Sequence, residues 1–158
     1  MELSIIFLPL IASNITGLFG KYIGDRNSEI VTSALVSISA LLSIFVFYQV
    51  IVNQYEENIV IATWISSGSL DVNWSMLIDP LSAVMLVVVT SVSALVHIYS
   101  IGYMSHDPHK PRFMAYLSLF TFAMLMLVTS DNFIQLFFGW EGVGLCSCLL
   151  YTSPSPRD

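Results

Sequence analysis

The sequence predicts an all-α integral membrane protein with about five transmembrane helices and one short extramembrane β-hairpin. Of its 158 residues, 56% are hydrophobic and only 10% are charged, with a mean hydropathy of +0.79. Soluble proteins carry about 25% charged residues. Five uncharged or nearly uncharged runs are long enough to cross a bilayer, and short polar segments separate them. A soluble globular domain is therefore excluded.

The charge and the metal-binding residue types limit the function further. A net charge of −6, a pI near 4.7 and the lack of a basic stripe argue against nucleic acid as a partner. The two cysteines, Cys146 and Cys148, are two residues apart, and on a helix this spacing directs their thiols to different sides. We therefore expect them to be small packing residues. His106 and His109 lie in a proline-containing loop, where we expect solvated imidazoles and no metal.

The first two runs predict two packed membrane helices. Residues 3–20 are just long enough to span, and Pro9 is tolerated in such a helix because neighbouring helices satisfy the freed carbonyl. We expect a polar turn at 21–29 and a second helix over 30–55. Three hydroxyl residues of the second run fall close to one face, which suits close helix packing in lipid: Thr32, Ser39 and Ser43.

The segment 56–79 differs in kind from the runs around it. Apolar and polar residues alternate over 70–76, which predicts a half-buried strand. Residues 59–65 are β-prone, and 66–69 supply the turn. We therefore expect a hairpin outside the bilayer, lying on the membrane domain.

The third run, 80–104, combines an apolar helix with one polar stripe. Pro80 is placed to open the helix. Thr90, Ser93, His97 and Ser100 follow at helical spacing along one face. Two interpretations of His97 stay open: a titrating member of a proton path, or a neutral side chain bonded to a carbonyl or hydroxyl of another helix.

After an expected polar loop at 105–112, residues 113–130 form the fourth run, separated from the fifth by Asp131 alone. Such a short connection predicts antiparallel neighbours. The fifth run, 132–151, carries Glu141 at its centre. A charged side chain at that depth costs a few kcal/mol and is rarely left without a partner or a task.

Glu141 is accordingly the principal candidate site residue. Its helical neighbours Phe137, Phe138, Gly144 and Leu145 offer no side-chain donor, so a partner must come from another helix. The functional hypothesis is proton transfer, because a nearby cation favours the ionised form of a carboxylate and its withdrawal favours the protonated form. The alternative is a structural, protonated Glu141 bonded to a neighbouring helix.

Two of the loops between the runs contain basic residues: Lys21 and Arg26 in one, and Lys110 and Arg112 in the other. The fifth basic residue, Arg157, lies in the polar tail. By the positive-inside rule, these loops face the cytoplasmic or equivalent side. The N-terminus and the hairpin then lie on the outer, periplasmic or intermembrane, side.

The motifs together resemble a known family. Ile-Asp-Pro-Leu-Ser at 78–82, Val-His-Ile-Tyr-Ser-Ile-Gly-Tyr-Met at 96–104, Arg-Phe at 112–113 and Gly-Trp-Glu-Gly-Val-Gly at 139–144 are specific to it. They are similar to the large antiporter-like subunit of proton-pumping NADH:quinone oxidoreductase, respiratory complex I, called chain L in bacteria and subunit 5 in mitochondria. The likeness holds through Ser147. We therefore expect 1–151 to be the N-terminal part of an antiporter-like transmembrane domain, and the polar tail 152–158 to be foreign to a truncated sequence.

The resemblance implies a role in coupling NADH oxidation and quinone reduction to proton pumping in the bacterial or mitochondrial inner membrane. The residue matching Glu141 belongs to a proton-transfer unit with a lysine on a later helix, and no lysine follows Lys110 here. The family's NADH, FMN, iron-sulfur and quinone sites lie in other subunits, so no cofactor is expected in this chain. The partners would be other membrane subunits and lipid. Two alternatives remain: the large subunit of a multisubunit sodium/proton antiporter, or a non-transporting membrane scaffold.

Overall fold

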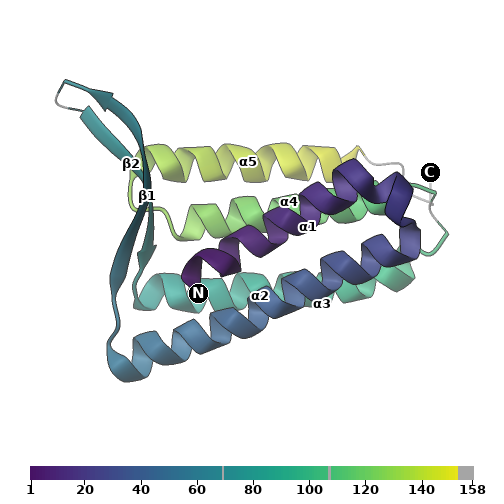
Figure 1. Cartoon of the computed structure of the whole chain (residues 1–158), viewed down its shortest axis with the longest axis horizontal. Helices are drawn as coiled ribbons and strands as arrows, with labels where there is room; N and C mark the ends of the chain where they lie inside the picture. Colours follow the sequence, from purple (N-terminus) through teal and green to yellow (C-terminus); the bar gives the residue numbers. More distant parts are fainter. Residues whose placement is uncertain (69, 107, 153–158) are drawn as a thin grey trace.

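The computed structural model describes residues 1–68, 70–106 and 108–152, and it contains five helices and one hairpin (Figure 1). The elements follow in the order α1 (Glu2–Ile23), α2 (Asp25–Asn53), β1 (Glu57–Ser67), β2 (Leu70–Ile78), α3 (Pro80–Tyr103), α4 (Lys110–Val128) and α5 (Phe133–Tyr151). In the described part of the chain, all five helices are long and apolar enough to cross a membrane. The predicted fold class is confirmed. Of the expected foreign tail, 152–158, the structure describes Thr152 alone, and 153–158 lie outside the described residues.

The expected polar turn at 21–29 is wrong. α1 continues through Lys21 to Ile23, and α2 already begins at Asp25. Gly24 alone joins them, with φ of 84°, a backbone conformation that glycine adopts without the steric cost of a Cβ. Lys21 in the last turn of α1 and Asp25 in the first turn of α2 also suit the dipoles of their helices.

The expected loop at 105–112 is wrong at its C-terminal boundary, because α4 already begins at Lys110. Pro111 lies in its first turn, where the missing N–H has no partner to lose. The connection between α4 and α5 is longer than Asp131 alone, since α4 ends at Val128. Asn132 caps α5 by accepting a hydrogen bond of 2.9 Å from the Gln135 N–H.

The hairpin crosses the end of the bundle where α2 ends and α3 begins, and its two strands extend beyond the helices (Figure 1). The strands are antiparallel, with Glu57 opposite Ile78 and Ser67 opposite Leu70. An aromatic cluster joins the sheet to α5: Trp64, Trp74 and Phe138, with ring centroids 4.9 to 5.8 Å apart. The predicted hairpin on the membrane domain is therefore confirmed.

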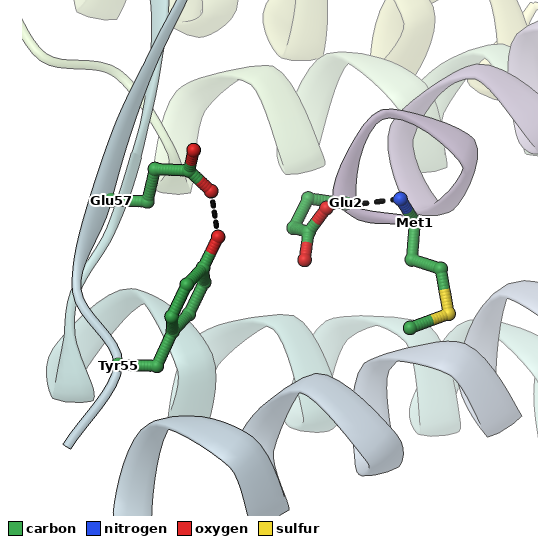
Figure 2. A network of polar contacts seen from close by, with 4 residues as sticks. All are labelled: Met1, Glu2, Tyr55 and Glu57. Carbon is green, nitrogen blue, oxygen red and sulfur yellow. Dashed lines mark hydrogen bonds and ion pairs between the residues drawn. The ribbon is translucent and has the colours of Figure 1, made fainter. Parts of the chain in front are cut away.

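Two short polar contacts lie where the N-terminus approaches the beginning of the hairpin (Figure 2). The Met1 ammonium lies 3.0 Å from the Glu2 carboxylate. The Tyr55 hydroxyl donates to the Glu57 carboxylate. We therefore call this end of the bundle the hairpin end, and the opposite end, with the α1–α2 and α3–α4 connections, the basic-loop end.

The apolar core lies near the hairpin end and joins four helices to β2: Ile5, Ile6, Val46, Val50, Met76, Ile78, Ala83, Leu86, Leu125 and Met126. α1 packs on α2 and α4, α2 packs on α3, and α5 packs on α4. Only Gln135, Gly139 and Cys146 of α5 are buried. One face of α5 is thus left uncovered by the described residues.

Candidate functional site

Glu141 lies in the middle of α5, on the face that points away from α4. The opposite face packs on α4 through glycines: a Cβ on Gly139 would meet the Leu127 backbone at 2.8 Å, and one on Gly142 would meet Ala123 at 3.2 Å. Without side chains at 139 and 142, the backbones of two helices can approach closely. The helix that approaches here is α4, and it lies on the side away from Glu141.

The Glu141 side chain is exposed, and among the described residues it has no hydrogen bond or ion pair. Its neighbours on the uncovered face are large and apolar, with exposed fractions of 61% for Phe137, 65% for Trp140 and 61% for Leu145. A carboxylate that faced lipid from the middle of a span would be costly, and such groups face protein or water-filled cavities. The uncovered face of α5 is therefore suited to contact with another protein surface that offers polar or cationic groups to Glu141.

His97 is fully buried between α3 and α4. Its Nδ1 lies 2.8 Å from the Ser93 carbonyl oxygen, and its Nε2 lies 3.0 Å from the Ser118 hydroxyl oxygen. A carbonyl can only accept, so Nδ1 carries a proton, and Nε2 of the neutral ring accepts from Ser118. Both ring nitrogens of a neutral His97 therefore have hydrogen-bond partners. Nε2 is the atom that could take up a proton.

The other members of the predicted stripe extend this polar seam along α3. The Ser93 and Thr121 hydroxyls are 2.5 Å apart, which links α3 to α4. The Thr90 and Ser43 hydroxyls are 2.7 Å apart, which links α3 to α2. The helix face expected from residue spacing is therefore buried, and its hydroxyls bond to two neighbouring helices.

The structure does not bring the two candidate residues together. His97 lies between α3 and α4, whereas Glu141 lies on the side of α5 remote from α4. α4 packs on both α3 and α5 and lies between these two helices (Figure 1). A proton path through this part of the chain cannot run from His97 to Glu141 by direct contact.

Sequence reasoning missed one pair of charges. Glu29 of α2 is only 6% exposed, and its Oε1 lies 3.7 Å from Nζ of Lys110 at the start of α4. We expected both residues in polar loops, at 21–29 and 105–112. A signal was present, because the face of Thr32, Ser39 and Ser43 reaches Glu29 when it is extended by one helical turn.

The two cysteines lie as expected from their spacing. Cys146 is buried and Cys148 is exposed, so their thiols point to different sides of α5. The described part of the chain contains no group of three or more His, Cys, Asp or Glu side chains placed to hold a metal ion.

These features define the chain as part of a polytopic membrane protein that carries a buried polar seam and an intramembrane carboxylate. A family model for the N-terminus of NADH-ubiquinone oxidoreductase (complex I) chain 5 matches residues 64–114. NADH-ubiquinone oxidoreductase chain 5 of Arabidopsis thaliana is 57% identical over 150 residues, which is 95% of this chain and 22% of the relative. The protein of the same name from Phytophthora infestans is 55% identical over 148 residues, 94% of this chain and 22% of the relative. The chain belongs to this chain 5 family, and it spans about a fifth of the length of the relatives it matches.

A solved structure shares the fold. The archaeal membrane-bound sulfane sulfur reductase, a respiratory membrane complex, contains a chain that matches with a TM-score of 0.75 at 17% identity. The match covers 93% of this chain and 29% of that chain. At this identity the likeness supports the arrangement of helices and hairpin alone.

Proposed function

We propose that the whole protein is the proton-translocating membrane subunit of an NADH:quinone oxidoreductase, and that Glu141 carries a proton-transfer step in it. Membership of the chain 5 family supports the assignment to that complex. The observation that carries the role of Glu141 is its place at mid-helix, on the face of α5 that no described residue covers.

The physical reason lies in the energy that transport must supply. Moving one charge across a membrane at 100 mV costs about 2.3 kcal/mol, so a driven proton step needs a site whose proton affinity changes. A cation that approaches a carboxylate favours the ionised form, and its withdrawal favours the protonated form. An unpartnered Glu141 on an open helix face is accessible to such a cation, and we infer that a lysine from a later helix supplies it.

We further propose the setting of this subunit. The NADH, flavin, iron-sulfur and quinone sites lie in other subunits, and this chain binds other membrane subunits and lipid but no nucleic acid. The membrane is the bacterial or mitochondrial inner membrane. The four basic residues beside the α1–α2 and α3–α4 connections support an orientation with the N-terminus on the outer side.

The test is proton uptake by inside-out vesicles that contain the complete protein in its complex, with NADH oxidation followed in parallel. Glu141→Gln should oxidise NADH but pump poorly. A pumping ratio equal to wild type would make Glu141 structural. Transport that depends on sodium and not on NADH would instead support the antiporter alternative.

A further inference from the structure

We propose that Glu29 and Lys110 form a second proton-exchange pair, at the basic-loop end of the bundle, which feeds a water-linked path through Ser33 and Ser100 to His97. This inference rests on the proposed proton-translocating function. It assigns a site on α2 and α4, separate from Glu141 on α5.

The pair is buried but incompletely bonded. The side chains of Lys110 and Glu29 are 18% and 7% exposed, and the distance of 3.7 Å between Nζ and Oε1 exceeds that of a hydrogen bond. Oε1 of Glu29 has no hydrogen-bond partner among the described residues. A buried ion pair is stabilising only when good geometry and further hydrogen bonds offset the loss of hydration. A fixed structural bridge would therefore be poorly made here.

A second unpartnered oxygen lies nearby. Ser33 is only 7% exposed, and its hydroxyl likewise has no partner among the described residues. Glu29 and Ser33 are one helical turn apart on the same face of α2. Buried polar atoms without a protein partner are commonly satisfied by bound water, which forms about three hydrogen bonds. The two oxygens and the Lys110 ammonium together supply the partners that such a water needs.

The position of Ser33 connects this water site to the polar seam. α2 and α3 are antiparallel neighbours, and the contact between Ser43 and Thr90 fixes their relative level. Counting ten residues back from Ser43 and ten forward from Thr90 brings Ser33 level with the buried Ser100. Ser100 lies one turn from His97 on the same face of α3. In the proposed path, water carries the proton across from this level of α2 to His97, which is hydrogen-bonded to Ser93 and Ser118.

Solvent enters the molecule close to the basic-loop end of this path. A hollow of about 560 Å³ lies at the basic-loop end, and His109 and Pro111, the residues on either side of Lys110, both line it. Gly24 and Asp25, at the start of α2, line it as well. Lys110 and Glu29 do not line the hollow, but it brings solvent beside the first turn of α4, where the Lys110 side chain is 18% exposed.

The proton step balances without another reagent. A hydronium ion gives its proton to Oε1 of Glu29, so one O–H bond breaks, one forms and water remains. Glu29 becomes neutral and its attraction to Lys110 is lost. The acid then gives the proton to the water chain, which delivers it to Nε2 of His97 while Nδ1 keeps its own proton on the Ser93 carbonyl. The renewed carboxylate returns to Lys110.

The experiment uses the complete protein in its complex, in inside-out vesicles. We compare Glu29→Gln, Glu29→Asp and the double variant Glu29→Gln, Lys110→Met, with Glu56→Gln as the control at an exposed site of the hairpin end. The double variant removes both charges, so it leaves no uncompensated buried lysine and stays testable if Glu29→Gln alone fails to assemble. The readout is protons taken up per NADH oxidised.

We expect Glu29→Gln and the double variant to lower this ratio by about half or more, Glu29→Asp to retain more of it, and Glu56→Gln to match wild type. Infrared difference spectra during turnover should show a protonated carboxyl band that the glutamine variant lacks. A wild-type ratio in the double variant, or no such band, would make the pair purely structural and overturn the inference. Glu141→Gln is measured alongside, to distinguish failure of this inference from failure of the proposed function. Normal pumping in Glu29→Gln with poor pumping in Glu141→Gln overturns only this inference. Normal pumping in both variants overturns the proposed function as well.

Discussion

Gln135 on α5 holds the backbone of Ser75 on β2 with two hydrogen bonds. The Ser75 N–H donates to Oε1 of Gln135 at 3.0 Å, and Nε2 of Gln135 donates to the Ser75 carbonyl at 2.7 Å. Both residues are buried. The side-chain amide thus replaces a neighbouring strand at the free edge of β2, and it attaches the hairpin to the helix that carries Glu141.

The first prediction follows from this pair. Gln135→Leu keeps the volume similar but leaves the Ser75 N–H and carbonyl buried and unpaired, at a cost of about 1–3 kcal/mol. Hydrogen exchange of the Ser75 amide in the complete protein should become faster. Gln135→Glu restores an acceptor for the N–H alone, and its effect on exchange should be smaller. Unchanged exchange in Gln135→Leu would show that the hairpin is held by its aromatic contacts with Phe138.

The second prediction concerns the packing of α5 on α4. A Cβ on Gly139 would lie 2.8 Å from Cα and 2.9 Å from N of Leu127, and backbone atoms cannot rotate away. Gly139→Ala should therefore force the helices apart and destabilise the protein by about 1–3 kcal/mol. The matched control is Gly102→Ala, where a Cβ meets nothing within 4 Å. Thermal unfolding in detergent should separate the two variants, and equal midpoints would contradict the close approach.

The third prediction separates the two interpretations of His97. Ser118→Ala removes the donor to Nε2, and His97→Gln keeps a polar side chain that cannot accept a proton. We expect both complexes to assemble, but only His97→Gln to lose much of its proton uptake per NADH, because a relay needs the titrating ring and not one hydroxyl. Wild-type uptake in His97→Gln would establish that the ring is only a packing and hydrogen-bonding group.

The fourth prediction concerns orientation. In a variant with Cys146 and Cys148 replaced by serine, single cysteines at Asn27 and His109 should react with an impermeant thiol reagent from the cytoplasmic or equivalent side. A cysteine at Ser67, in the hairpin, should react from the outer side. Basic residues near Asn27 and His109 and the opposite position of the hairpin are the reason. Labelling of Asn27 from the outer side would reverse the orientation.

The fifth prediction concerns Glu141 in the complete protein. Glutamine keeps the shape of the side chain but cannot titrate, so Glu141→Gln should assemble normally and pump only a small fraction of the wild-type protons per NADH. Aspartate still titrates but is one methylene shorter, so Glu141→Asp should keep part of the activity. Exposed Glu56→Gln is the control for loss of charge alone. Equal pumping by the glutamine variant and wild type would show that the carboxylate is not a proton-transfer group.

The sequence alone determined the elements that depend on local pattern. Membrane-length apolar runs predict helices wherever they occur, because a backbone in lipid must satisfy its own hydrogen bonds. The alternation at 70–76 predicted a strand, and the spacing from Thr90 to Ser100 predicted one polar face of α3. Glu141 could be singled out because a charge in the middle of an apolar run is conspicuous whatever surrounds it.

The tertiary structure decided what depends on contacts between distant segments. Glu29 and Lys110 are 81 residues apart, and only the packing of α2 beside α4 turns two residues of apparent loops into a buried pair. The helix ends at Gly24 and Lys110 likewise depend on a backbone angle and on neighbouring helices, since polar residues are equally at home in a loop and in a terminal turn. The sequence also could not tell which face of α5 meets α4. The glycines at 139 and 142 take that side because the backbones approach closely there, and Glu141 is left on the uncovered face.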